Sequence, residues 1–305
     1  MTPSTETPVG SSAGTGGSAG TGSSAGTSSG RAEIGVIGVI GGSGFYEFLT
    51  DSERIRITTP FGDPSDDVVI GDLEGRRVAF LTRHGQDHRF PPHRVNYRAN
   101  LWALRSVGVR QVLAPCAVGS LRPQHGPGSI VVPDQVVDRT WGRDHTVYDG
   151  VCPVVHVGFA DPYCPHGREA AVHAGRAAGK NVVDAGTLVV INGPRFSSRA
   201  ESLWHQQAGW TVVGMTGMPE ASIARELAMC FTTIALVTDH DAGVDGGEAV
   251  THEEVLKVFA RSIDAMKAVL RSTIAAMPVA EDDATATCAC RRSLDGLRLP
   301  ITLPT

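Results

Sequence analysis

Residues 232–243 have the sequence Thr232-Thr-Ile-Ala-Leu-Val-Thr-Asp-His-Asp-Ala-Gly243, an apolar, β-branched run that ends in two carboxylates. A run of this kind bounded by polar residues predicts a buried strand. In open α/β sheets, ligands bind outside the carboxyl ends of the strands. We therefore expect Asp239 and Asp241 to lie beside a bound ligand.

These two aspartates have two interpretations. Neighbouring carboxyl groups in a partly buried cleft rarely ionise together, so one can accept a hydrogen bond while the other keeps a proton to donate. Asp is also a favoured N-cap residue, and the pair could simply cap a following helix. The segment alone leaves general acid chemistry and helix capping both open.

Composition limits the class of protein. The chain has 305 residues, of which 41% are hydrophobic and 19% charged, enough to bury one large core or two modest ones. The net charge of -5, with no basic block, argues against nucleic acid or an anionic membrane as a partner. No apolar run is long enough to span a bilayer.

The six cysteines are scattered along the chain without paired zinc spacing, which is typical of reduced thiols in a cytosol. Cys288 and Cys290 form the one close pair. We interpret it as a feature of the tail with a possible redox role, because two sulfurs alone do not complete a tetrahedral metal site.

The chain divides into three parts. Residues 1–30 are almost wholly Gly, Ser, Ala, Thr and Pro, a composition that predicts a disordered arm. This arm lacks the basic start and apolar segment of a secretory signal. Residues 31–278 alternate strand and helix patterns and predict one layered α/β domain. Residues 279–305 form a C-terminal tail.

The first predicted strand runs into Gly41-Gly-Ser-Gly44. Glycines let the backbone curl close to a ligand, and the N–H groups of such a turn can bind an anion, with the Ser43 hydroxyl as a further donor. The segment has neither the Lys-Ser/Thr of a P-loop nor dinucleotide-binding spacing. A plain strand-to-turn connection remains the alternative.

A second apolar strand, from Val78, ends at Arg83 and His84. The guanidinium fork matches a phosphate, and the histidine can add a donor. His84, His88 and His93 also suggest a metal site, but the Glu of a zincin motif is missing and Gly and Pro surround them.

Further patterns predict the remaining order of elements. The predicted elements are a helix at 96–108, strands at 109–120, 129–138 and 186–192, a helix from 193 to about 209, a short strand and turn at 211–216, a helix with Pro219 at its first position, and a helix opened by a Thr251-x-x-Glu254 capping box.

Five motifs together resemble the S-methyl-5'-thioadenosine phosphorylase branch of the purine nucleoside phosphorylase family. The motifs are Ile40-Gly-Gly-Ser-Gly44, Arg83-His84-Gly85, Gly193-Pro-Arg-Phe-Ser-Ser-Arg-Ala-Glu-Ser202, Met215-Thr216 with Pro219-Glu220, and Thr238-Asp-x-Asp241. The resemblance extends from about Ile34 to Met277, and Leu303-Pro304 is similar to the family's C-terminal tail.

The resemblance implies a three-layer α/β fold with a distorted central mixed sheet flanked by helices. It also implies a cytoplasmic homotrimer that uses inorganic phosphate as co-substrate, without a metal or an organic cofactor. Phosphate would attack the anomeric carbon of 5'-deoxy-5'-(methylthio)adenosine, releasing adenine and 5-(methylthio)ribose 1-phosphate. Adenosine, other 5'-substituted (including 5'-halo) 5'-deoxyadenosines and 6-oxopurine nucleosides are alternative substrates.

The same resemblance implies a role for each site residue. Phosphate would be bound by Ser43, Arg83, His84, Cys116, Ala117 and Thr216. The nucleoside would contact Phe196, Ser197, Met215, Asp239, His240, Asp241, His252 and Val255, with Asp241 as the acid and Asp239 facing the purine edge. His156 and the tail near Thr302 would reach a neighbouring subunit's 5' pocket.

Two residues depart from the family pattern. Cys116 stands where Thr is common, and a thiol is a poorer donor to phosphate than a hydroxyl. His252 stands where a small apolar residue commonly lines the pocket for the 5' substituent, unless this histidine faces solvent.

Two other classes of function remain open. One is metal-dependent hydrolysis through the histidines, which would be sensitive to chelators and indifferent to phosphate. The other is a purine-binding protein without catalysis, which would bind the nucleoside and release no adenine.

Overall fold

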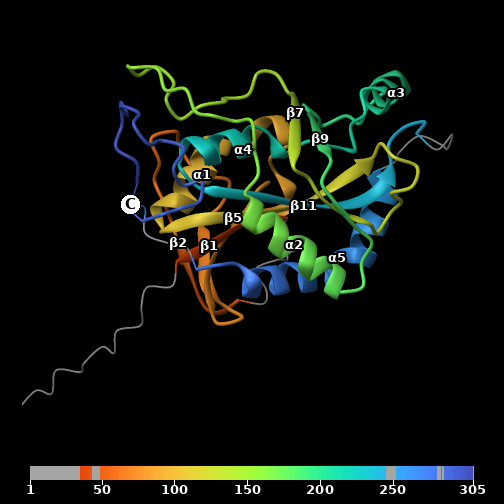
Figure 1. The fold of residues 1–305 in the computed structure, drawn as a ribbon, viewed down its shortest axis with the longest axis horizontal. Coiled ribbons are helices and arrows are strands. Elements are labelled where there is room, and N and C mark those ends of the chain that lie inside the picture. Colours follow the sequence, from red (N-terminus) through yellow and green to blue (C-terminus); the bar gives the residue numbers. More distant parts are fainter. Residues whose placement is uncertain (1–34, 43–48, 245–251, 280–282, 284, 305) are drawn as a thin grey trace, which may run out of the picture. The chain divides into compact units, whose positions relative to one another are not determined.

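The computed structural model of the chain describes residues 35–42, 49–244, 252–279, 283 and 285–304, with the backbone alone for 252, 254–256 and 259 (Figure 1). The predicted N-terminal arm, Ser43 and the Thr251 cap therefore lie outside the described residues. None of the described helices combines the length and apolarity needed to cross a bilayer.

One mixed sheet of 11 strands organises the described chain. The strands are β1 (Val36–Gly41), β2 (Thr50–Ile55), β3 (Val68–Leu73), β4 (Arg76–Thr82), β5 (Val109–Ser120), β6 (Ile130–Val132), β7 (Gln135–Arg139), β8 (Val182–Asp184), β9 (Thr187–Ile191), β10 (Val212–Gly214) and β11 (Cys230–His240). The main order is β2-β3-β4-β1-β5-β10-β9-β7, and β11 pairs with β5 and β6 off this path. The branch at β5 gives the predicted distortion of the sheet.

The pairing of β5 with β11 forms the centre of the sheet. It is parallel and continues from Cys230 beside Gln111 to His240 beside Ser120. Residues 230–238 of β11 are all buried, as the β-branched apolar run predicted. The carboxyl end of β11, with Asp239, therefore lies at the same edge as the end of β5.

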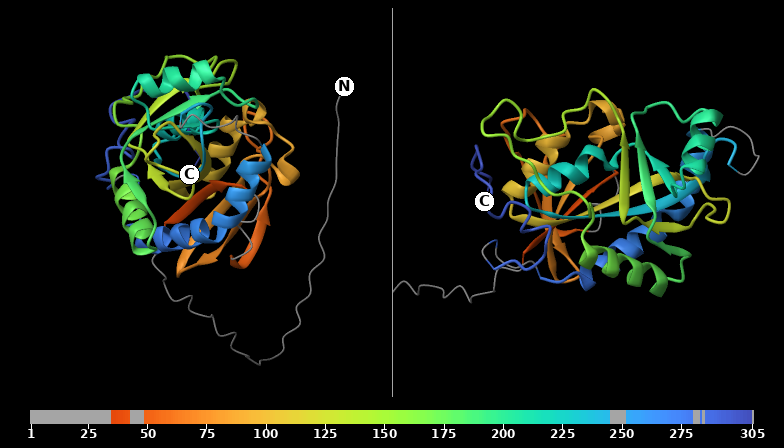
Figure 2. Two further views of the ribbon diagram at one scale, coloured as in Figure 1. Left: turned by 90° about the vertical axis from the view of Figure 1, so that its right-hand side faces the viewer. Right: turned by 45° about the horizontal axis from the view of Figure 1, so that its top comes forward.

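Helices cover both faces of the sheet, which gives three layers (Figures 1 and 2). The helices are α1 (Tyr97–Ser106), α2 (Pro165–Ala177), α3 (Arg199–Gln207), α4 (Gly217–Glu226) and α5 (His252–Ala276). Helices α1 and α4 pack together on one face, and α2 and α5 pack together on the other. Each pair encloses its own large hydrophobic cluster against the strands.

Several predictions of local structure were inexact. The predicted strand at 129–138 is two strands, β6 and β7, which pair with different neighbours. Pro133 stands at the break, where it has no N–H to donate to a ladder. Pro219 is the third residue of α4, not its first, and has non-helical backbone angles. Strands β2, β3 and β8 and helix α2 were not predicted from the sequence.

Helix α2 lies very close to β11 at Gly167. A Cβ added to Gly167 would lie 2.0 Å from Thr232 Oγ1 and 3.1 Å from Thr232 Cβ. Thr232 is fully buried in the sheet and cannot move aside without disturbing its neighbours. Only glycine therefore permits this approach of helix to strand.

We expect Gly167→Ala to lower the free energy of unfolding by about 1–3 kcal/mol, because the added methyl overlaps a buried β-branched side chain. Thermal and urea unfolding measure the effect. Gly158→Ala is the matched control, since Gly158 is exposed and its added Cβ meets no heavy atom within 4 Å. Equal stability of the two variants would contradict the tight packing of α2 on β11.

Candidate active site

A cavity of about 590 Å³ lies where several strands of the sheet end. It is lined by Gly42, Arg83, His84, His88, Phe90, Pro91, Pro92, Pro115, Cys116, Ala117, Val118, Gly119, Ile191, Pro194, Phe196, Ser197, Val213, Gly214, Met215, Thr216, Thr238, Asp239, Asp241 and Met266. Most of these residues stand at or just after the carboxyl ends of β4, β5, β9, β10 and β11, which is where ligands bind in sheets of this kind.

Arg83 enters the cavity wall from the end of β4 and is held rigidly. Its Nε donates to Glu220 Oε1 at 2.6 Å and its Nη2 donates to Glu220 Oε2 at 3.1 Å. Nη2 also donates to Ile40 O at 2.8 Å, and Nη1 donates to Pro115 O at 3.1 Å. Four of the five guanidinium N–H groups are thereby used, and within the described residues one on Nη1 is left for a ligand.

The Arg83–Glu220 pair is buried, with side chains 3% and 0% exposed. Burial lowers the pKa of the Arg83 guanidinium, but the facing Glu220 carboxylate outweighs burial and raises that pKa above its usual value. A positive charge is therefore fixed in the wall of the cavity. Apart from its place in a motif, no sequence pattern indicated the role of Glu220.

His84 is neutral in this environment. Its pKa is lowered to about 4, chiefly by burial and then by the charge of Arg83. Nδ1 donates to the carbonyl oxygen of Phe90 at 2.8 Å, so the lone pair of the neutral ring is on Nε2. The ring also stacks on His88, with centroids 4.8 Å apart. His84 can thus accept a proton when an anion binds beside it.

Cys116 and Thr216 complete this part of the wall. Burial raises the pKa of the Cys116 thiol to about 12, so it stays protonated. Thr216 is the N-cap residue of α4, and its hydroxyl makes no capping bond to its own helix. Together with Ala117, these residues and Arg83 form a pocket suited to an oxyanion.

The two aspartates lie together against Gly119 of β5. A Cβ at Gly119 would be 3.0 Å from Asp239 Oδ2 and 3.4 Å from Asp241 Cβ. The Thr238 hydroxyl lies 2.7 Å from Asp239 Oδ1, and the buried Ser202 of α3 donates to Asp241 Oδ2. Within the described residues these carboxylates face the cavity and cap no helix, which favours the chemical interpretation.

The cavity wall between the Arg83 pocket and the two aspartates is less polar. Phe196 and Met215 line it, and Met215 lies over Gly193, where an added Cβ would be 2.7 Å from its Sδ. Ser197 Oγ is buried, and none of the described residues bonds to it. Such an oxygen is available to a ligand.

The remaining predicted site residues fall into two groups. His156 and Thr302 are exposed, His240 is half-buried, and none of the three lines the cavity. Ser43 and the side chains of His252 and Val255 lie outside the described residues. Sequence reasoning assigned no role to Ser202, Thr238 or Gly119, although the first two stand within or beside the quoted motifs.

The model of the family described as "Phosphorylase superfamily" matches residues 36–275. The chain belongs to the phosphorylase superfamily. Among curated members, a purine nucleoside phosphorylase of Streptomyces coelicolor is 58% identical over 88% of this chain and 97% of its own. An S-methyl-5'-thioadenosine phosphorylase of Mycolicibacterium smegmatis is 52% identical over 88% of this chain and 100% of its own.

Solved structures of methylthioadenosine phosphorylases have a similar fold. A methylthioadenosine phosphorylase from an antarctic soil metagenomic library matches with a TM-score of 0.78 and 39% identity, over 86% of this chain and 91% of its own. The methylthioadenosine phosphorylase of Schistosoma mansoni in complex with tubercidin matches with a TM-score of 0.72 and 38% identity, over 78% of this chain and 90% of its own. The predicted family branch, fold and pentosyltransferase class are confirmed.

We expect Glu220→Ala to lower the free energy of unfolding by about 3–5 kcal/mol, because it leaves the buried Arg83 charge uncompensated. Glu53→Ala is the control. It removes the exposed Arg77–Glu53 pair, joined at 3.0 Å, and should cost about 0–1 kcal/mol. The double variant Arg83→Met, Glu220→Leu should recover most of the loss. Equal unfolding energies for the two alanine variants would refute this account.

Proposed function

We propose that this enzyme cleaves 5'-deoxy-5'-(methylthio)adenosine with inorganic phosphate, giving adenine and 5-(methylthio)ribose 1-phosphate. The observation that carries the proposal is one cavity with a fixed cation in one part of its wall and two carboxylates in another. The curated relative from Mycolicibacterium smegmatis bears the name of this activity.

The spacing of the two parts supports a substrate between them. Arg83 bonds to Pro115, and the aspartates lie against Gly119, four residues further along β5. At about 3.3 Å per residue these anchors are ~13 Å apart, which leaves room for an anion, a pentose and a purine.

The reaction forms a bond from a phosphate oxygen to C1' and breaks the bond from C1' to N9. Positive charge develops on the sugar, where the phosphate dianion stabilises it, and the electron pair of the broken bond moves to the purine. Asp241 donates a proton to N7 of the leaving base. A positioned general acid of this kind contributes about 10²–10⁴-fold.

Phosphate is bound in this proposal by the remaining Arg83 N–H, His84, Thr216 and the backbone at Cys116 and Ala117, with Ser43 as a further donor. The Cys116 thiol adds little, because it is a weak donor. Phosphate is the co-substrate, and catalysis uses no metal and no organic cofactor. We also propose a cytoplasmic homotrimer, in which His156 and the tail near Thr302 reach a neighbouring subunit.

A second substrate class has one observation in its favour. The Streptomyces coelicolor relative at 58% identity is named a purine nucleoside phosphorylase, so adenosine, other 5'-substituted 5'-deoxyadenosines including 5'-halo compounds, and 6-oxopurine nucleosides belong in the same assay. The 5' end would contact His252 and Val255. Asp239 argues against 6-oxopurines, because an ionised carboxylate accepts from an exocyclic amine and repels a carbonyl oxygen.

One assay tests the proposal. Adenine release from methylthioadenosine is measured with and without phosphate, and with a chelator added together with the substrates. We expect release only with phosphate, an unchanged initial rate with chelator, and methylthioribose 1-phosphate as co-product. Release without phosphate would indicate a hydrolase, and binding without release would indicate a non-catalytic protein. Either result would overturn the proposal.

Asp239→Asn should shift preference toward 6-oxopurine nucleosides, because an amide can donate to the 6-oxo group that the carboxylate repels. The ratio of kcat/KM for adenosine to kcat/KM for inosine measures the shift, which we expect to be at least about 10-fold. Asp138→Asn, outside the cavity, is the control. An unchanged ratio of kcat/KM values would show that Asp239 does not select the purine base.

Phosphate binding should be accompanied by proton uptake, because the bound anion raises the pKa of His84 from its low value of about 4. Phosphate affinity should accordingly fall as pH rises through the pKa of the complex. Calorimetry in buffers of different ionisation enthalpy counts the protons. His84→Asn should abolish the uptake, and the exposed His173→Asn should retain it. Proton uptake that persists in His84→Asn would show that a group other than His84 takes up the proton.

A further inference from the structure

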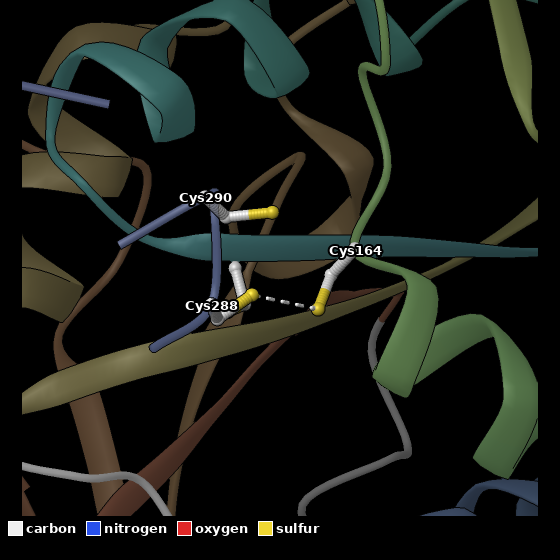
Figure 3. A group of neighbouring side chains, drawn as sticks. Cys164, Cys288 and Cys290 are labelled. Carbon is white, nitrogen blue, oxygen red and sulfur yellow. Dashed lines mark hydrogen bonds between the residues drawn. The ribbon is translucent and has the colours of Figure 1, made fainter. Parts of the chain in front are cut away.

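Four cysteines meet far from the cavity. Cys164 is the N-cap residue of α2, and Cys288 and Cys290 belong to the C-terminal segment that follows α5 (Figure 3). Cys230 is the first residue of β11. Their four Sγ atoms all lie within 4.8 Å of one another. Three of the four residues are buried, and Cys288 is half-buried. The expectation that only two sulfurs would be available is therefore wrong.

Backbone contacts hold the sulfurs together independently of the sulfurs themselves. The N–H of Cys164 donates to the carbonyl oxygen of Phe231 at 2.8 Å, which places the start of α2 beside the start of β11. The close packing at Gly167 continues this contact. In the C-terminal segment, the N–H of Arg291 donates to Cys288 O at 2.9 Å, and this turn presents both cysteines to the same point.

The sulfur spacing fits one tetrahedral metal ion. Zinc–sulfur bonds of about 2.3 Å require sulfurs ~3.8 Å apart along each edge of the tetrahedron. Cys164 Sγ lies 3.8 Å from Cys288 Sγ, and Cys230 Sγ lies 3.6 Å from Cys288 Sγ. A disulfide requires about 2.05 Å, and all four residues are free cysteines in the structure. Four sulfurs in tetrahedral contact are typical of zinc or iron sites.

We propose that Cys164, Cys230, Cys288 and Cys290 bind one structural Zn²⁺ ion. Binding converts four thiols to thiolates and releases four protons, so that the complex carries a net charge of −2. Arg225 compensates part of this charge, because its Nη2 donates to Cys290 Sγ at 3.8 Å while its other bonds run to the carbonyl oxygens of Gly158 and Asp161. Hydrogen bonds to the ligating sulfurs are typical of metal sites.

The position of the site indicates a structural role. Cys230 begins β11 and Asp239 stands nine residues later near its end, so that about 30 Å of strand separates the metal from the carboxylates. Four protein ligands leave no open position for a substrate. The ion instead joins the C-terminal segment to the sheet. The same segment is also anchored by Ser293 Oγ, which donates to Arg225 O at 2.7 Å.

The first experiment measures metal and thiols in the full chain, produced with zinc in the medium and purified without chelator. Elemental analysis should find about one zinc per chain. After denaturation with chelator, all six cysteines should react with a thiol reagent. Absence of zinc, with only two reactive thiols because the four have oxidised to two disulfides, would overturn the proposal. Iron in place of zinc would overturn the assignment of the ion.

The second experiment compares cysteine variants. Cys290→Ser removes one ligand, and Cys152→Ser, at an exposed cysteine outside the cluster, is the matched control. Loss of an outer partner alone typically weakens a metal by about 10–100-fold, so loss of a ligand should weaken zinc by at least that factor. Cys152→Ser should bind as the parent does. Equal zinc affinity in the two variants would exclude Cys290 as a ligand.

A third measurement needs no variant and keeps the proposal testable if Cys290→Ser fails to fold. Replacing zinc by Co²⁺ in the parent chain should produce the thiolate-to-cobalt charge-transfer absorption and visible bands of a tetrahedral site. Removing the metal should make the chain after α5 newly susceptible to proteolysis, because the ion no longer anchors it. A cobalt spectrum without thiolate bands, or cleavage unaffected by metal removal, would contradict a tetrathiolate site.

Discussion

The parallel pairing of β5 with β11 is the constraint on which the rest of the structure depends. Its register shifts between Val237 and Asp239, where β11 has one residue more than its partner. Such a bulge redirects the strand and its side chains. Beyond it, Asp239 pairs with Gly119, and the absence of a Cβ there leaves space for both carboxylates. A one-residue change in this register would turn the aspartates away from the cavity.

The cavity wall contains one group with a fixed charge, Arg83, and one whose protonation can change, His84. The buried pair of Arg83 and Glu220 is rigid, so it holds a charged donor in a fixed direction in the cavity wall. His84 is held neutral beside it, because burial and the charge of Arg83 lower its pKa to about 4. A preorganised site of this kind needs little reorganisation when substrate binds.

Local patterns predicted much of the fold. The apolar β-branched runs located β5 and β11 within one or two residues, and the helix predicted at 96–108 is α1 with Asn96 as its cap. Arg83 and Asp241, the polar residues expected at strand ends, line the same cavity. Contacts between distant segments were not predictable, because nothing local to Glu220 shows that it faces Arg83. The cysteines are the clearest case, since Cys164 and Cys288 are separated by 124 positions and meet only in the folded sheet.

Cys116 has a consequence for inhibitor chemistry. A thiol reacts with electrophiles and peroxides through its thiolate, and a pKa of about 12 leaves almost none of that form at neutral pH. A cysteine with a reactive thiolate in the substrate cavity would be a target for electrophilic inhibitors and for oxidation. Burial instead favours the protonated thiol at Cys116, which argues for reversible ligands over alkylating agents in this cavity.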